Sequence, residues 1–124
     1  MTNPIKNRAN TIFIHVSNLE KSVIWYSKLL NQQVDAADIS RPVYNLAMNQ
    51  YTGITLDAGP SGTTKEITPL PYPLFNFHTE DIYEAYQHIK KFEYKIVSEI
   101  VEFDDFAYFN IIDPDGNIIM ICNG

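Results

Sequence analysis

Hydrophobic and polar positions alternate in two short segments of the chain, and a helical spacing of hydrophobic residues follows each segment. Residues 11–16 read TIFIHV, a β-branched and aromatic run that is typical of a strand. The hydrophobic positions that follow have helical spacing: Leu19, Val23, Tyr26 and Leu30. The pattern predicts a strand and then a helix, and Ser17 with Glu20 three residues later predicts a capping box at the start of that helix.

The same strand and helix pattern recurs further along the chain. A shift of 63 residues places His15 on His78 and Asn18 on Asp81. The second helix has its own hydrophobic stripe: Ile82, Ala85, Tyr86, Ile89 and Phe92. Asp81 precedes this helix and Glu84 lies in its first turn, where acidic side chains suit the helix dipole. The repetition indicates a duplicated unit.

The rear part of each copy has the pattern of a strand meander. In the second copy, AYFNII and NIIMIC flank DPDG, which predicts a hairpin. In the first copy, the shift places Gly53 on Gly116 and Asp57 on Met120. Each half is therefore expected to be βαβββ, with helices on one side of a largely antiparallel sheet, which is an α+β fold.

The length and composition fit one domain made of these two halves. The chain has 124 residues, and 45% of them are hydrophobic. We expect the first half at about residues 9–59 and the second at about 73–124. Residues 60–72 are rich in Gly, Pro, Ser and Thr, and we expect them to link the halves.

Strand alternation predicts which side chains face away from the helices. Ile12, Ile14 and Val16 are expected to meet the helix, which leaves His15 on the opposite face. The full set predicted for the faces turned from the helices mixes polar and hydrophobic residues: Phe13, His15, Asp57, Leu74, Asn76, His78, Tyr108, Asn110, Ile118 and Met120. Such a mixture is the usual lining of a small-molecule pocket.

Charge narrows the choice of partners. The formal net charge is −6 and the pI is about 4.8, which argues against nucleic acid or an anionic membrane and favours a cationic or neutral ligand. The single cysteine, Cys122, is expected to be a packed thiol. With no apolar span or signal-peptide pattern, a cytoplasmic location is expected.

Three segments together carry a family resemblance. HVSNLEKSVIWYSKLL, FHTEDIYEAYQHIK and FNIIDPDGNIIMIC resemble the two strand–helix signatures and the closing hairpin of the vicinal-oxygen-chelate superfamily, which includes glyoxalases, bleomycin resistance proteins and extradiol dioxygenases. The resemblance implies tandem βαβββ modules whose curved sheets form an open cup with the helices outside.

The resemblance also implies where a metal would be bound, and the residues at those positions differ from the usual ligands. The positions are Thr11, Leu74 and Met120, with Asp57 as the pseudo-equivalent position in the first half. Because only one of these four positions carries a possible metal ligand, the protein is expected to bind no metal and no cofactor. The expected function is metal-independent binding of a small molecule, as in bleomycin resistance members. The expected binding residues are Phe13, His15, Asp57, Asn76, His78, Tyr108, Asn110 and Met120.

Two alternatives stay open. The chain could be a lyase, isomerase or dioxygenase of the same superfamily that uses His15, His78 and Asp57 with an atypical metal or none. It could also be an interaction module, since single-domain members commonly form homodimers, and a homodimer is expected in either case.

Overall fold

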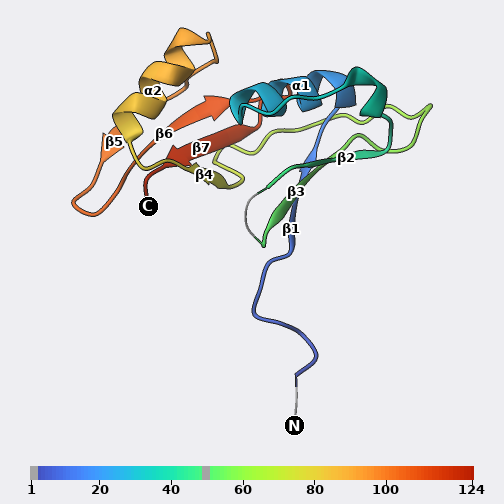
Figure 1. Ribbon diagram of the computed structural model, residues 1–124, viewed down its shortest axis with the longest axis horizontal. Helices are drawn as coiled ribbons and strands as arrows, with labels where there is room; N and C mark the ends of the chain where they lie inside the picture. The colour runs from blue at the N-terminus through green and yellow to red at the C-terminus, as the bar shows by residue number, and fades with distance from the viewer. Residues whose placement is uncertain (1–2, 49–50) are drawn as a thin grey trace. The chain divides into compact units, whose positions relative to one another are not determined.

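The computed structural model describes residues 3–48 and 51–124 and consists of short strands and two α-helices (Figure 1). The elements in chain order are β1 (Thr11–His15), α1 (Leu19–Leu29), the 3₁₀ helix η1 (Ala36–Asp38), β2 (Val43–Leu46), β3 (Gly53–Asp57), β4 (Asn76–His78), α2 (Ile82–Lys91), β5 (Val101–Glu102), β6 (Ala107–Ile112) and β7 (Ile118–Cys122). Within the described ranges, no helix has the length and hydrophobicity needed to cross a membrane.

The chain divides into two compact units, with the boundary in the sequence between Glu66 and Ile67. The first unit has a sheet of order β1-β3-β2, and the second has a sheet of order β4-β7-β6-β5. In each sheet the first pair of strands is parallel and the remaining pairs are antiparallel. The α+β class with two similar modules is confirmed. The sheets are mixed, and the described part of the first unit has three strands instead of the four predicted.

The first helix begins one residue later than the capping-box prediction. Asn18 is the N-cap of α1, and its Oδ1 accepts a hydrogen bond of 3.0 Å from the Lys21 backbone N–H. The prediction that Ser17 caps this helix is therefore wrong. Asp81 caps α2 in the same way, accepting from the N–H groups of Tyr83 and Glu84. Asn and Asp are preferred caps because a short side-chain oxygen reaches N–H groups that the helix leaves unpaired.

The helix in each unit covers one face of the sheet. In the first unit, α1 packs on β2 and β3, and the fully buried side chains include Ile14, Val16, Val23, Tyr26 and Leu56. In the second unit, α2 packs on β6 and β7, and the Tyr86 ring meets the Phe109 ring edge to face at 5.2 Å. Burial of these side chains is the main stabilising contribution in each unit.

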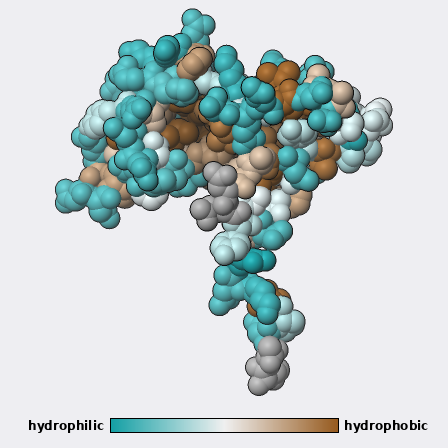
Figure 2. Space-filling view, viewed as in Figure 1, coloured by the Kyte–Doolittle hydropathy of each residue, from teal (hydrophilic) through white to brown (hydrophobic). Residues whose placement is uncertain are grey.

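On the opposite sheet faces, side chains of β1 and β4 are exposed, whereas Thr55 and Cys122 on the neighbouring strands are buried. Phe13 is 57% exposed although its neighbour Ile14 is fully buried, and His15 is exposed. In β4, Asn76 and His78 are exposed while Phe77 between them is partly covered. Hydrophilic residues cover most of the visible surface in Figure 2, and hydrophobic residues reach that surface in places.

The predicted hairpin between β6 and β7 is confirmed. The buried Asp113 carboxylate accepts hydrogen bonds from the backbone N–H groups of Asp115 and Asn117, at 2.9 and 2.8 Å. Gly116 has a φ of +87°, a conformation that side chains with a Cβ rarely adopt. The DPDG motif therefore fixes the register of β6 and β7.

Candidate functional site

His15 and Asp57 lie next to each other at the ends of two parallel strands. They are register partners in β1 and β3, so their side chains project from the same sheet face. This is the face turned away from α1, and it also carries Phe13. The sequence placed all three residues on one face, and the structure brings His15 and Asp57 together.

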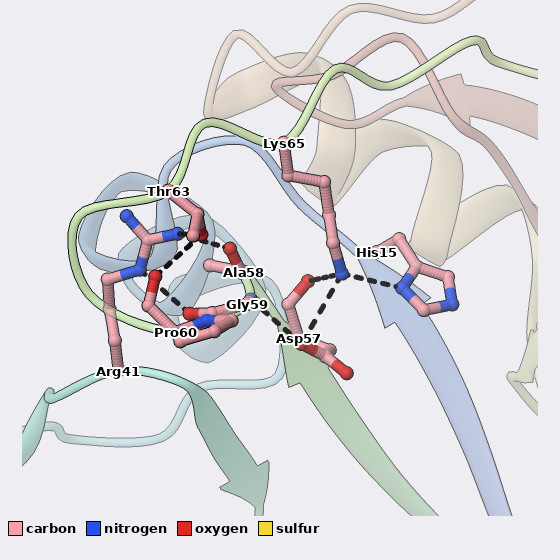
Figure 3. Close-up of polar contacts among 8 residues, drawn as sticks. All are labelled: His15, Arg41, Asp57, Ala58, Gly59, Pro60, Thr63 and Lys65. Carbon is pink, nitrogen blue, oxygen red and sulfur yellow. Dashed lines mark hydrogen bonds and ion pairs between the residues drawn. The ribbon is translucent and has the colours of Figure 1, made fainter.

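Lys65 joins these two residues and was missed by the sequence analysis. Its Nζ lies 2.9 Å from His15 Nδ1, 3.3 Å from Asp57 Oδ1 and 3.0 Å from the Asp57 carbonyl oxygen (Figure 3). The lysine comes from the segment expected to be a linker, where it is the only basic residue between 60 and 72. No motif marks it, and only the path of the chain after β3 reveals its role.

An arginine holds the turn that leads to Lys65. Arg41 Nε donates to the Gly59 carbonyl oxygen at 2.9 Å, and its guanidinium also donates to the Ala58 carbonyl oxygen and to Thr63 Oγ1 (Figure 3). Thr63 Oγ1 in turn donates to the Pro60 carbonyl oxygen at 2.6 Å. These bonds fold the segment back over the end of β3.

The Asp57 carboxylate is stabilised in its charged form. The Gly59 backbone N–H donates to Asp57 Oδ1 at 2.9 Å and is the main cause that lowers the pKa of Asp57 below its ordinary 3.8. Partial burial acts in the opposite direction, while the hydrogen bond and charge of Lys65 lower this pKa further. Asp57 is therefore ionised at neutral pH and forms an ion pair with Lys65.

The second unit brings together the other predicted residues on one sheet face. His78 pairs with Cys122, which pairs with Tyr108, while Asn76 pairs with Met120, which pairs with Asn110. Asn76 Nδ2 lies 4.0 Å from Met120 Sδ. Asn110 Oδ1 is buried and has no hydrogen-bond partner within residues 3–48 and 51–124. Cys122 is buried, as expected, and its Sγ accepts from the Gly124 N–H.

Strand pairing changes the correspondence between the halves. His15 pairs with Asp57 and His78 pairs with Cys122, so Cys122 is the counterpart of Asp57. Likewise, Phe13 pairs with Thr55 whereas Asn76 pairs with Met120, which makes Thr55 the counterpart of Met120. The constant shift placed Asp57 on Met120 and is wrong by two residues in these strands.

Residues 8–121 match the model of the Glyoxalase/Bleomycin resistance protein/Dioxygenase superfamily. The chain belongs to this superfamily. A comparison with curated protein sequences gives no match.

Solved structures of the superfamily type share the fold. Similar structures include oxidase ChaP-H1, with 17% identity, a TM-score of 0.69 and coverage of 96% of this chain and 97% of the other. A glyoxalase/dioxygenase from Nostoc punctiforme has 15% identity, a TM-score of 0.69 and coverage of 98% and 97%. The trypanothione-dependent glyoxalase I of Leishmania major has 20% identity, a TM-score of 0.66 and coverage of 95% and 87%. At these identities the likeness shows the fold alone.

The residues at the superfamily's metal-ligand positions do not fit a divalent metal. With the corrected correspondence, these positions hold Thr11, Thr55, Leu74 and Met120. Hydroxyl, aliphatic and thioether groups are not the imidazole and carboxylate ligands that such ions take. In the part of the chain that the structure describes, no three His, Cys, Asp or Glu side chains are grouped so as to hold a metal.

Proposed function

We propose that this superfamily member binds a small organic molecule without a metal, on the sheet face of a unit that carries its histidine, His15 in the first unit or His78 in the second. The observation that carries the proposal is the residue set at the metal-ligand positions, namely Thr11, Thr55, Leu74 and Met120. Binding then depends on hydrogen bonds and hydrophobic contact, which are the usual determinants of small-molecule recognition.

The first unit favours an uncharged or cationic ligand. Lys65 and Asp57 neutralise each other in an ion pair, and the three protons of the Lys65 ammonium group already have acceptors. The chain as a whole has a formal net charge of −6. Lys65 is therefore not available to a ligand anion, which would also meet a repulsive long-range field.

The second unit offers an unsatisfied acceptor beside hydrophobic surface. The buried Asn110 Oδ1 without a partner in the described ranges carries a desolvation cost that a ligand N–H or O–H group would remove. Leu74, which is 36% exposed, and Met120 provide hydrophobic contact on the same face. These features support a ligand with both polar and apolar parts.

The proposal is tested by thermal shift with a panel of neutral and cationic organic compounds, each measured with and without EDTA. A compound at a hundred times its Kd adds about 2.7 kcal/mol to the unfolding free energy, which raises the melting temperature by several degrees. We expect the same rise in EDTA. Stabilisation that disappears on chelation and returns with a divalent metal would contradict metal-independent binding.

Substitutions then locate the binding face. Phe13→Ala is expected to weaken binding of any compound found in this panel, because Phe13 exposes 57% of its surface next to His15. Phe92→Ala is the matched control, since Phe92 is 42% exposed at the end of α2. Equal losses of affinity in the two variants, measured by titration calorimetry, would place binding elsewhere.

The contact of His15 with Lys65 and Asp57 favours a second candidate, a metal-independent lyase or isomerase. An imidazole that is hydrogen-bonded to an ion pair can polarise a substrate oxygen through its remaining N–H group. With Nδ1 bonded to Lys65, the Nε2–H group of His15 would donate a hydrogen bond to that oxygen. His15→Gln should then abolish turnover of a candidate substrate without lowering the melting temperature, whereas full turnover in this variant would exclude the candidate.

A further inference from the structure

We propose that Lys65 is a positioning residue that fixes His15 as the neutral tautomer with its proton on Nε2, so that the face offers a hydrogen-bond donor to an acceptor atom of the ligand. The inference rests on the proposed function, because it specifies which hydrogen-bonding group of the bound molecule meets His15. Lys65 itself would not touch the ligand.

The tautomer follows from the chemistry of the contact between Lys65 and His15. An ammonium group carries three protons and no lone pair, so it can only donate. At 2.9 Å from Lys65 Nζ, His15 Nδ1 must therefore be the acceptor and cannot carry a proton. The single proton of a neutral imidazole then lies on Nε2, and a doubly protonated ring is incompatible with this contact.

Asp57 holds the lysine in place. The carbonyl oxygen and Oδ1 of Asp57 accept from Lys65 at 3.0 and 3.3 Å. Both side chains are about a quarter exposed, at 26% for Lys65 and 27% for Asp57. With His15 Nδ1, the ammonium group has three acceptors for three protons, so Lys65 acts through His15 and not on the ligand directly.

His78 occupies the equivalent strand position in the second unit, but within the described part of the chain it has no contact like that between His15 and Lys65. The sequence repeat aligns it with His15, but its register partner is Cys122 and not an aspartate. No hydrogen bond to the His78 ring occurs among residues 3–48 and 51–124, so that exposed imidazole is free to exchange its proton between the two nitrogens. His78 therefore serves as an internal reference for His15.

The fixed tautomer has a consequence for the class of ligand. His15 and Asp57 are register partners, so the donor at His15 Nε2 lies on the same sheet face as Asp57 Oδ2, an ionised acceptor without a partner in the described part of the chain. A neutral group that combines a carbonyl oxygen with an N–H, such as a carboxamide, complements this pair. A carboxylate ligand would meet the donor but would be repelled by Asp57.

The tautomer is measured by ¹⁵N NMR of the imidazole nitrogens at pH 8, without any ligand. In the wild-type protein we expect His15 to show one protonated and one unprotonated nitrogen, and His78 to show signals averaged between tautomers. In Lys65→Met the two His15 signals should move toward each other while those of His78 stay unchanged. Lys65→Arg, which keeps a charged donor, should restore the wild-type pattern in part.

Lys21→Met is the matched control, because it removes the same charge from an exposed position of α1 in the same unit. It should leave the His15 signals unchanged, and backbone amide spectra show whether each variant is folded. Averaged His15 signals in the wild-type protein, or identical His15 signals in the wild type and Lys65→Met, would overturn the inference. Neither result bears on metal-independent binding, which the EDTA experiment tests separately.

The ligand class is tested with benzamide and benzoate as a matched pair at millimolar concentration. Benzamide is expected to shift the His15 Nε2–H signal, and benzoate to shift it at least fivefold less. A response to benzoate that equals or exceeds the response to benzamide, or no response to either, would contradict the assignment of a carboxamide-like group.

Discussion

At the scale of single residues, the charge of Asp57 links the site to the pH dependence of stability. Its pKa in the folded protein is lowered, first by the Gly59 N–H and then by Lys65, so the stabilisation is present above the unfolded-state pKa and is lost as pH falls through the folded-state value. Asp57→Asn should therefore be less stable than the wild-type protein at pH 7, and this difference should shrink below about pH 3.8.

Urea unfolding at pH 7, 5 and 3 measures this effect. The carboxylate is partly exposed, so we expect a modest difference that solvent screening limits. Asp104→Asn, in an exposed loop position, is the control and should alter the unfolding free energy less than Asp57→Asn does at pH 7. A difference between Asp57→Asn and wild type that stays constant from pH 7 to pH 3 would contradict the proposed link.

The residues of the candidate site differ in how far the sequence alone could place them. His15 and Phe13 follow from strand alternation, which needs only their positions in one short segment. Lys65 lies 50 residues after His15 in a segment without regular structure, and its long side chain has many rotamers. A contact of that kind depends on the fold of the intervening chain, so no local pattern predicts it.

At the scale of secondary-structure elements, the N-caps give a direct test of where the helices begin. Asn18→Ala removes the acceptor for the Lys21 N–H and should lower the unfolding free energy by about 1 kcal/mol. Asn18→Asp keeps a side-chain oxygen and adds a negative charge at the helix N-terminus, so its stability should equal or exceed that of the wild type. Urea unfolding that ranks Asn18→Asp below Asn18→Ala would show that Asn18 does not act as the cap.

The repeat also shows the limit of sequence comparison between elements. The strand and helix that open each half align at a constant shift, and this shift aligns the two caps, Asn18 and Asp81. In β3 and β7, the correspondence between the halves differs from that shift by two residues. The difference arises because loop lengths differ between the halves, while hydrogen bonds to β1 and β4 set the register of these strands. The assignment of Thr55 to a metal-ligand position therefore required the strand pairing.

At the scale of the whole molecule, each unit has a hydrophobic core of its own. Phe109 is fully buried and contacts Tyr86 of α2, so Phe109→Ala should lower the unfolding free energy by about 3–5 kcal/mol. Phe103→Ala in the same unit is the control, because Phe103 is 54% exposed and its loss should cost much less. Similar unfolding free energies for the two variants would argue against the core described for this unit.

We propose that the protein forms a homodimer, as expected from the superfamily resemblance. The outer strands β1 and β2 of one sheet, and β4 and β5 of the other, have edges that pair with no further strand in the described ranges, and such edges favour association. Light scattering after size-exclusion chromatography should give a mass twice the 14.2 kDa of the chain. A mass of one chain at micromolar concentration would exclude a stable dimer.

By itself, the sequence determined the superfamily, the α+β class, the order of most elements and the faces that carry the two histidines. All of these depend on local periodicity and on turn motifs such as DPDG, which short-range interactions specify. Only the tertiary structure decided the register of β3 and β7, the pairing of His15 with Asp57 and the contact of both with Lys65. These depend on hydrogen bonds between segments far apart in the chain, whose partners are chosen when the whole unit packs.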